Sequence, residues 1–184
     1  MIESALMHHH ESRQWLSFEH PVAVLYARKA TEVLPLLNEI EARVEAETLT
    51  AVGFVTYEAA SGLDASLPTH PPSDNPLPLI SFALFREAHA VRSPTPAQAQ
   101  AHQLWRFSES AEDYQLALHR IRERIKAGDV YQINHTTRLN GVLNDPWQLF
   151  TEVAAGAPFG AYLQGDSHTI VSVSYTHLRA HETN

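Results

Sequence analysis

The sequence of 184 residues contains no cysteine and few basic side chains, and it has no long apolar segment. Without cysteine, neither a disulfide framework nor a thiolate metal site is possible, and the composition fits a reducing compartment. The 13 lysine and arginine residues form no cluster and are outnumbered by 21 acidic residues. With a formal net charge of -8, nucleic acid and anionic membranes are not expected partners.

Membrane and secretion signals are also missing from the sequence. No apolar run approaches the roughly 20 residues that cross a bilayer as a helix. The amino-terminal segment MIESALMHHHESRQW lacks the charged and apolar regions of a signal peptide. We therefore expect a cytoplasmic protein without membrane contact.

What remains is an ordinary globular composition, with 44% hydrophobic and 18% charged residues, enough for one good core or two small ones. Apolar segments predict four strands in the first part of the chain. These strands are expected at residues 21–27, 49–60, 79–85 and 102–107. Because both faces of residues 49–60 are largely apolar, this strand is predicted to be central. His8, His9 and His10 are expected on a flexible terminus with no fixed metal-binding geometry.

Two helices are predicted from apolar residues at helical spacing and from their end signals. Thr31 is expected to cap the first helix, and Pro35 fits only near its first turn, where backbone N–H groups lack partners. The second helix begins after Ser110, which forms a capping-box-like pair with Asp113, and it ends at Gly128. The two apolar stripes are Val33, Leu36, Leu37, Ile40 and Val44 in the first helix, and Tyr114, Leu118, Ile121 and Ile125 in the second.

The segment after Gly128 is predicted to be a strand over residues 130–139 with an unusual polar face. Side chains alternate along a strand, so one face carries an amide, a second amide, a hydroxyl and a guanidinium group. These side chains belong to Gln132, Asn134, Thr136 and Arg138. Such alternation most often marks a strand with one face exposed to solvent, which is the simpler explanation on composition alone.

The last part of the chain predicts a third helix and a hairpin. Asp145 and Pro146 give a helix start, with the aspartate as cap and the proline at the first position. Residues 160–174 predict two strands joined by a turn around Gly165 and Asp166. The buried side of the helix is expected to carry Trp147, Phe150 and Val153.

Several of these segments, in this order, resemble one enzyme family. The segment IKAGDVYQINHTTRL, followed by APFGAYL and IVSVS, is similar to the start of the chorismate-binding domain of para-aminobenzoate synthase component I, the aminodeoxychorismate synthases. The earlier segments GFVTYEAASGLD and LPLISFALF resemble the amino-terminal region of the same enzymes. The pairing of YEAA with YQIN favours these enzymes over anthranilate synthase.

The resemblance implies an α+β fold, namely the amino-terminal part of a large antiparallel β-sandwich with flanking helices. It places the amino-terminal region of the synthase component at residues 1–107 and the start of the chorismate-binding domain at residues 108–174. Residues 175–184 resemble no part of the family, and we expect them to be a non-native tail.

The activity that the resemblance implies is amination of chorismate to 4-amino-4-deoxychorismate in folate biosynthesis. Mg²⁺ is the expected cofactor, and a glutamine amidotransferase subunit is the expected source of ammonia. Because the magnesium ligands are expected beyond Ser174, the chain by itself is expected to be an inactive fragment. Two alternatives stay open: anthranilate synthase component I, which acts in tryptophan biosynthesis, and a non-catalytic binding fragment.

The resemblance also assigns a role to Gln132. In relatives that add water to chorismate, a lysine stands at this position and acts as a general base, whereas relatives that add ammonia have glutamine. This difference fits the chemistry, because ammonia is already a nucleophile and needs no base. Gln132 is therefore expected to select ammonia over water.

Three neighbours of Gln132 are expected to bind substrate, namely Asn134, Thr136 and Arg138. For two of them an alternative stays open. Asn134 can instead orient Gln132 or a loop, and Arg138 can meet a neighbouring glutamate instead of a chorismate carboxylate. His135, on the opposite face of the predicted strand, is given no chemical role.

Overall fold

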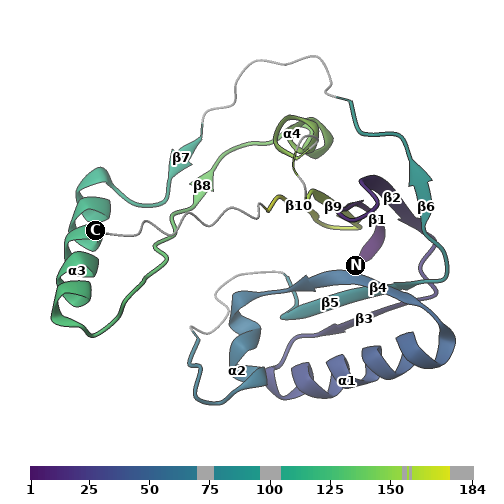
Figure 1. The fold of residues 1–184 in the computed structure, drawn as a ribbon, viewed down its shortest axis with the longest axis horizontal. Coiled ribbons are helices and arrows are strands. Elements are labelled where there is room, and N and C mark those ends of the chain that lie inside the picture. Colours follow the sequence, from purple (N-terminus) through teal and green to yellow (C-terminus); the bar gives the residue numbers. More distant parts are fainter. Residues whose placement is uncertain (70–76, 96–104, 155–156, 158, 175–184) are drawn as a thin grey trace. The chain divides into compact units, whose positions relative to one another are not determined.

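The computed structural model describes residues 1–69, 77–95, 105–154, 157 and 159–174. The chain forms two compact units (Figure 1), the first from residues 1–97 and 146–184 and the second from residues 98–145. The domain boundary expected between residues 107 and 108 rests on the family resemblance, and it stays a prediction. None of the helices in the described ranges is long and apolar enough to cross a membrane.

A five-stranded antiparallel sheet in the first unit combines strands from residues 2–19 and 89–91 with strands from residues 161–172. Its order is β10-β9-β1-β2-β6, so β1 lies in the middle. The hairpin predicted around Gly165 is confirmed as β9 and β10. The strands are β1 (Ile2–His9), β2 (Gln14–Glu19), β6 (His89–Val91), β9 (Ala161–Gly165) and β10 (Thr169–Ser172).

The expectation of a flexible amino terminus is therefore wrong. Ile2 and Ala5 are buried, and β1 is hydrogen-bonded on both sides, to β2 and to β9. His8 belongs to this central strand, and its ring lies 5.2 Å from that of Trp15. The sequence argument failed because β9, the second partner of β1, comes from the far end of the chain.

A three-stranded antiparallel sheet completes the strands of the first unit, in the order β3-β5-β4. The strands predicted at residues 21–27 and 79–85 are confirmed as β3 (Ala23–Ala27) and β5 (Ile80–Phe85). The strand predicted at residues 49–60 is shorter, because β4 (Thr50–Val55) is followed by η1 (Tyr57–Ala59) and α2 (Ala60–Leu63). It was also expected to be central, but in the described sheet β4 is an edge strand and β5 is central.

Helix α1 (Ala30–Glu47) covers one face of this sheet (Figure 1) and buries Val33 and Ile40 against it. The predicted cap is wrong, because the N-cap residue is Lys29 and Thr31 lies inside the helix. The Glu32 carboxylate accepts the Lys29 backbone N–H at 3.2 Å, which supplies the end signal instead. Pro35 consequently lies two residues further into the helix than expected, where its missing N–H removes an intrahelical hydrogen bond.

The core of the first unit lies between its two sheets. One apolar cluster combines residues of both sheets, so the sheets pack against each other through these side chains. Its buried members are Ile2, Ala5, Phe18, Val52, Ala83, Phe85 and Leu163. The fold of this unit is thus α+β, with antiparallel sheets throughout.

Helix α4 (Pro146–Val153) starts where the sequence predicts, and of the three side chains expected on its buried side only Phe150 is buried. Phe150 is fully buried with Trp15 and Ala154 in a small cluster. Trp147 and Val153, which were expected on the buried side, are 38% and 47% exposed. The helix is short, and the cluster draws in Ala154 just after its end instead of Val153.

The second unit contains α3 (Ala111–Ala127) and the strand pair β7 (Arg106–Phe107) and β8 (Leu139–Asn140). The predicted start and end of α3 are confirmed: Ser110 caps it, and Gly128 ends it with a φ of 78°. The strand predicted over residues 130–139 is wrong except at its end, where Leu139 pairs with Phe107. Residues 130–138 pair with no strand among the described residues, so alternation alone did not make a sheet.

Candidate functional site

The four predicted site residues lie on the segment between α3 and β8, and all four are exposed. Gln132 Nε2 donates a hydrogen bond to Asn134 Oδ1 at 3.3 Å. The structure therefore contains the contact that one interpretation of Asn134 requires, in which Asn134 orients Gln132. Thr136 makes no polar contact with the other described residues.

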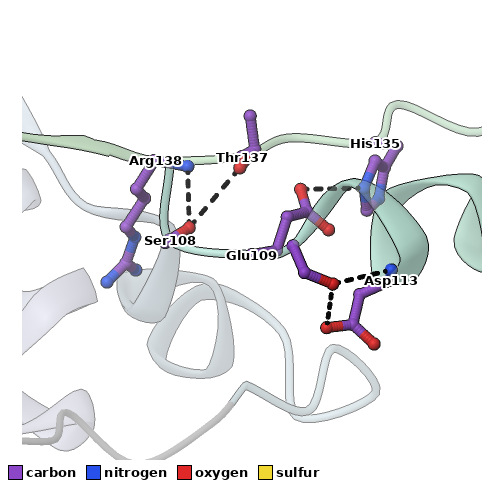
Figure 2. A network of polar contacts seen from close by, with 7 residues as sticks. Ser108, Glu109, Asp113, His135, Thr137 and Arg138 are labelled. Carbon is purple, nitrogen blue, oxygen red and sulfur yellow. Dashed lines mark hydrogen bonds and ion pairs between the residues drawn. The ribbon is translucent and has the colours of Figure 1, made fainter. Parts of the chain in front are cut away.

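The carboxyl end of this segment is held by Ser108 (Figure 2). The Ser108 backbone N–H donates to the Arg138 carbonyl at 2.8 Å, and the Arg138 N–H donates to Ser108 Oγ at 3.1 Å. The Ser108 and Thr137 hydroxyls are 3.4 Å apart. These contacts fix the backbone of Arg138 next to β7, while its guanidinium group points away from Glu109 and pairs with no carboxylate of the described residues.

A second contact links the segment to the residue before the cap of α3. His135 Nε2 lies 3.3 Å from Glu109 Oε1, and the two side chains are 26% and 22% exposed. The His135 ring also contacts the Tyr114 ring, with 5.5 Å between centroids. The contact is an ion pair only when His135 is protonated, and it gives this histidine a packing role that the sequence did not predict.

The start of α3 is held by contacts between Ser110 and Asp113. The Asp113 backbone N–H donates to Ser110 Oγ at 3.0 Å, and the Ser110 hydroxyl donates to the Asp113 carboxylate at 2.8 Å. Glu112 and Asp113 place negative charge in the first turn, which offsets the positive end of the helix dipole. These contacts hold Ser110 in place as the first residue of the helix start.

A cavity of about 410 Å³ lies beside this helix start. Neither Gln132 nor Asn134 lines it, so the structure does not gather the predicted site residues around one cavity. Glu109 was not predicted by the sequence, and the one signal for it was its position directly before a strong helix cap. The lining residues are Phe107, Glu109, Ser110, Ala111, Tyr114 and Thr137.

Charged side chains elsewhere on α3 belong to its surface. Lys126 Nζ donates to Glu123 Oε1 at 2.9 Å, and this hydrogen bond lowers the pKa of the Glu123 carboxyl. Both side chains are more than half exposed. The pair supports the helix and lies outside the candidate site.

A magnesium site is not formed by the described part of the chain. No group of three or more histidine, aspartate or glutamate side chains lies close enough there to hold a metal ion.

The three consecutive histidines near the amino terminus make packing and turn contacts. His9 Nδ1 lies 2.9 Å from Ser12 Oγ, and the His10 ring lies 4.8 Å from that of Phe159.

Comparisons with known proteins agree with the resemblance seen in the sequence. A family model described as chorismate binding enzyme matches residues 3–178. Aminodeoxychorismate synthase component 1 of Escherichia coli strain K12 is 32% identical over 73 residues, which are 38% of this chain and 16% of that protein. The chain thus spans a small part of that relative's length. No solved structure matches the chain.

Proposed function

Because the chain belongs to the family of chorismate-binding enzymes, we propose that it is part of an enzyme that aminates chorismate to 4-amino-4-deoxychorismate. The observation that carries this proposal is Gln132, a neutral amide in the segment YQIN, on a family match that covers residues 3–178. The similarity to aminodeoxychorismate synthase component 1 supports this reaction over related ones. The product would enter folate biosynthesis in the cytoplasm.

Gln132 is proposed to select ammonia as the nucleophile. An amide side chain donates and accepts hydrogen bonds but does not take a proton at neutral pH, so it orients ammonia without generating hydroxide from water. The contact from Gln132 Nε2 to Asn134 Oδ1 leaves the Gln132 carbonyl oxygen as the acceptor for an ammonia N–H. Asn134 is therefore proposed to act as a positioning residue for Gln132.

Arg138 and Thr136 are proposed to contact the substrate. The Arg138 guanidinium has no carboxylate partner among the described residues, and arginine binds carboxylates through paired hydrogen bonds. Chorismate carries carboxylates, so an exposed arginine near Gln132 in sequence is a suitable ligand for one of them. Thr136, which is exposed between them, is proposed to add a hydroxyl contact.

The remaining parts of the reaction are proposed to come from outside the described residues. The chain covers 16% of the matched relative, so we expect the magnesium ligands and the acid and base groups on further segments. Ammonia is proposed to come from a glutamine amidotransferase subunit. The polypeptide alone is accordingly proposed to be inactive, and its two packed sheets to be the amino-terminal part of the large β-sandwich implied by the resemblance.

The test begins with the source DNA. The reading frame that contains these 184 codons is sequenced through its full length, and the encoded protein is incubated with chorismate, Mg²⁺ and ammonium. We expect 4-amino-4-deoxychorismate from that protein and no product from the 184-residue chain. Formation of anthranilate instead would replace the proposal with the anthranilate synthase alternative.

Two matched variants test the role of Gln132. Gln132→Lys introduces a base and is expected to lower amination roughly tenfold or more, with an isomer of chorismate appearing instead, in which a hydroxyl from water replaces the departing ring hydroxyl. Gln115→Lys makes the same change on the exposed surface of α3 and is expected to leave the products unchanged. If both variants aminate chorismate equally well, Gln132 does not select the nucleophile.

A further inference from the structure

The cavity beside the start of α3 is mostly apolar, with one carboxylate and the hydroxyls of Ser110 and Thr137 among its lining groups. Phe107, Ala111 and Tyr114 supply apolar surface, and Glu109 reaches the same space from the residue before the cap. Glu109 Oε1 is buried and accepts no hydrogen bond from the described residues. His135 Nε2 lies 3.3 Å from this oxygen and forms an ion pair with it only when protonated, so neutral His135 leaves the oxygen without a donor.

A buried carboxylate oxygen without a donor is unfavourable. Removing an ionised oxygen from water costs free energy that only a hydrogen bond or an opposite charge restores. A ligand that brings a charged N–H donor to Glu109 would form a short, charge-assisted hydrogen bond with this oxygen. The carboxylate therefore favours a cationic group as its missing partner.

The charges around the cavity favour the same kind of ligand. Glu112 and Asp113 follow in the first turn of α3 and offset the positive end of its dipole. Figure 2 shows the Arg138 guanidinium directed away from Glu109, and His135 is the titratable base in contact with that carboxylate. An anion in the cavity would be repelled by the Glu109 carboxylate, because no lysine or arginine side chain lines the cavity to offset that charge.

We propose that this cavity binds a small apolar amine: its ammonium group donates to Glu109, and its hydrocarbon part packs against Phe107, Ala111 and Tyr114. A volume of about 410 Å³ lies within the ordinary range for small-molecule sites. The site goes beyond the proposed amination reaction, because chorismate is an anion and would be repelled by Glu109. Its test is accordingly independent of any synthase activity.

The experiment titrates the full 184-residue chain with phenethylamine and follows the backbone amide resonances by NMR. We expect saturable shifts at the lining residues near the start of α3. The acid of similar shape, 3-phenylpropionate, is expected not to bind, because its charge is repelled by Glu109. Equal binding of the amine and the acid would overturn the proposal, as would absence of saturation up to about 10 mM amine.

Three variants distinguish the contribution of the Glu109 carboxylate to amine binding from that of the cavity volume. Glu109→Gln keeps the size of the side chain but removes its charge, and it is expected to weaken amine binding roughly tenfold or more. Glu39→Gln makes the same change on the exposed surface of α1 in the first unit and is expected to bind like the parent chain. Ala111→Leu adds volume on the cavity side of the first turn and is expected to abolish binding while α3 stays helical by circular dichroism. Unchanged amine affinity in either Glu109→Gln or Ala111→Leu would refute the site.

Discussion

Helices α1 and α3 have nearly the same length, 18 and 17 residues, and both carry an apolar stripe at helical spacing. They differ in what their stripes contact. Helix α1 buries Val33 and Ile40 against the three-stranded sheet, whereas α3 buries none of its side chains within the described residues. Helical periodicity thus identifies the apolar face of a helix, but only a partner surface buries it.

The difference also separates two sources of helix stability. Most of the stability of a helix in a protein comes from packing of its apolar face, and isolated helices of this length are marginal in water. Helix α1 has that packing, while α3 relies mainly on its own end signals at Ser110 and Gly128. Changes in the core should therefore act on the first unit, and changes at the helix ends should act on the second.

The largest expected effect comes from the core between the sheets. Phe85 is 0% exposed, and Phe85→Ala should lower the free energy of unfolding by about 3–5 kcal/mol. The matched change Phe107→Ala removes a ring that is 67% exposed in the second unit and should cost less than about 1 kcal/mol. Urea unfolding followed by tryptophan fluorescence measures both. Similar losses for the two variants would show that Phe107 is covered in solution.

The two helices are compared directly by a pair of isoleucine variants. Ile40→Ala removes a side chain that is 5% exposed on α1 and should cost about 2–4 kcal/mol. Ile125→Ala removes one that is 42% exposed on α3 and should cost less than about 1 kcal/mol. The same urea experiment applies. A cost for Ile125→Ala close to that for Ile40→Ala would mean that the apolar stripe of α3 is buried after all.

Elements with local signals could be predicted from the sequence. The start of α3 at Ser110 and its end at Gly128 depend on residues within one turn, and both were predicted correctly. The hairpin of β9 and β10 is likewise set by a short turn. Features that depend on distant partners could not be predicted: β1 becomes central because β9 pairs with it, and β4 becomes an edge because β5 lies between it and β3.

In the candidate site, too, local contacts could be predicted from the sequence and distant ones could not. Gln132 and Asn134 are two positions apart, and their contact was among the interpretations available from the sequence. Glu109 and His135 meet only because β7 pairs with β8 and brings the segment after α3 back to its start. The one sequence signal for Glu109 was its position directly before the cap of α3, and this signal does not indicate a cavity, so the cavity could not be predicted.

A smaller effect is expected at the cap of α3. Ser110→Ala removes the acceptor for the Asp113 N–H and should cost about 1 kcal/mol of helix stability. Because α3 buries no side chain among the described residues, this loss should appear as faster amide hydrogen exchange in its first turns, with α1 unchanged. Ser110→Asp, which keeps a capping acceptor, is the control. Equal exchange in Ser110→Ala and the parent chain would show that tertiary contacts hold α3.

The smallest effect is at the surface, where the two units should behave alike. The Ser66 backbone N–H donates to Asp64 in the first unit at 2.8 Å and lowers the pKa of this exposed carboxyl. A lowered folded-state pKa means that the stabilisation is complete above the ordinary aspartate pKa of about 3.9 and is lost as the pH falls through the folded value.

Asp64→Ala should therefore lower the melting temperature slightly at pH 7 and leave it unchanged at strongly acidic pH, and Asp64→Asn should lie in between. In the second unit, Glu123→Gln should reduce the helix signal of α3 over the same range of pH, because Lys126 lowers the pKa of Glu123 in the same direction. A difference for either variant that persists in strong acid would mean that its carboxyl acts through packing and not through charge. If both variants lose their effect in strong acid, the two units differ in the burial of their apolar faces and not in their surface charges. This result is expected because exposed ion pairs and hydrogen bonds contribute little to stability in either unit.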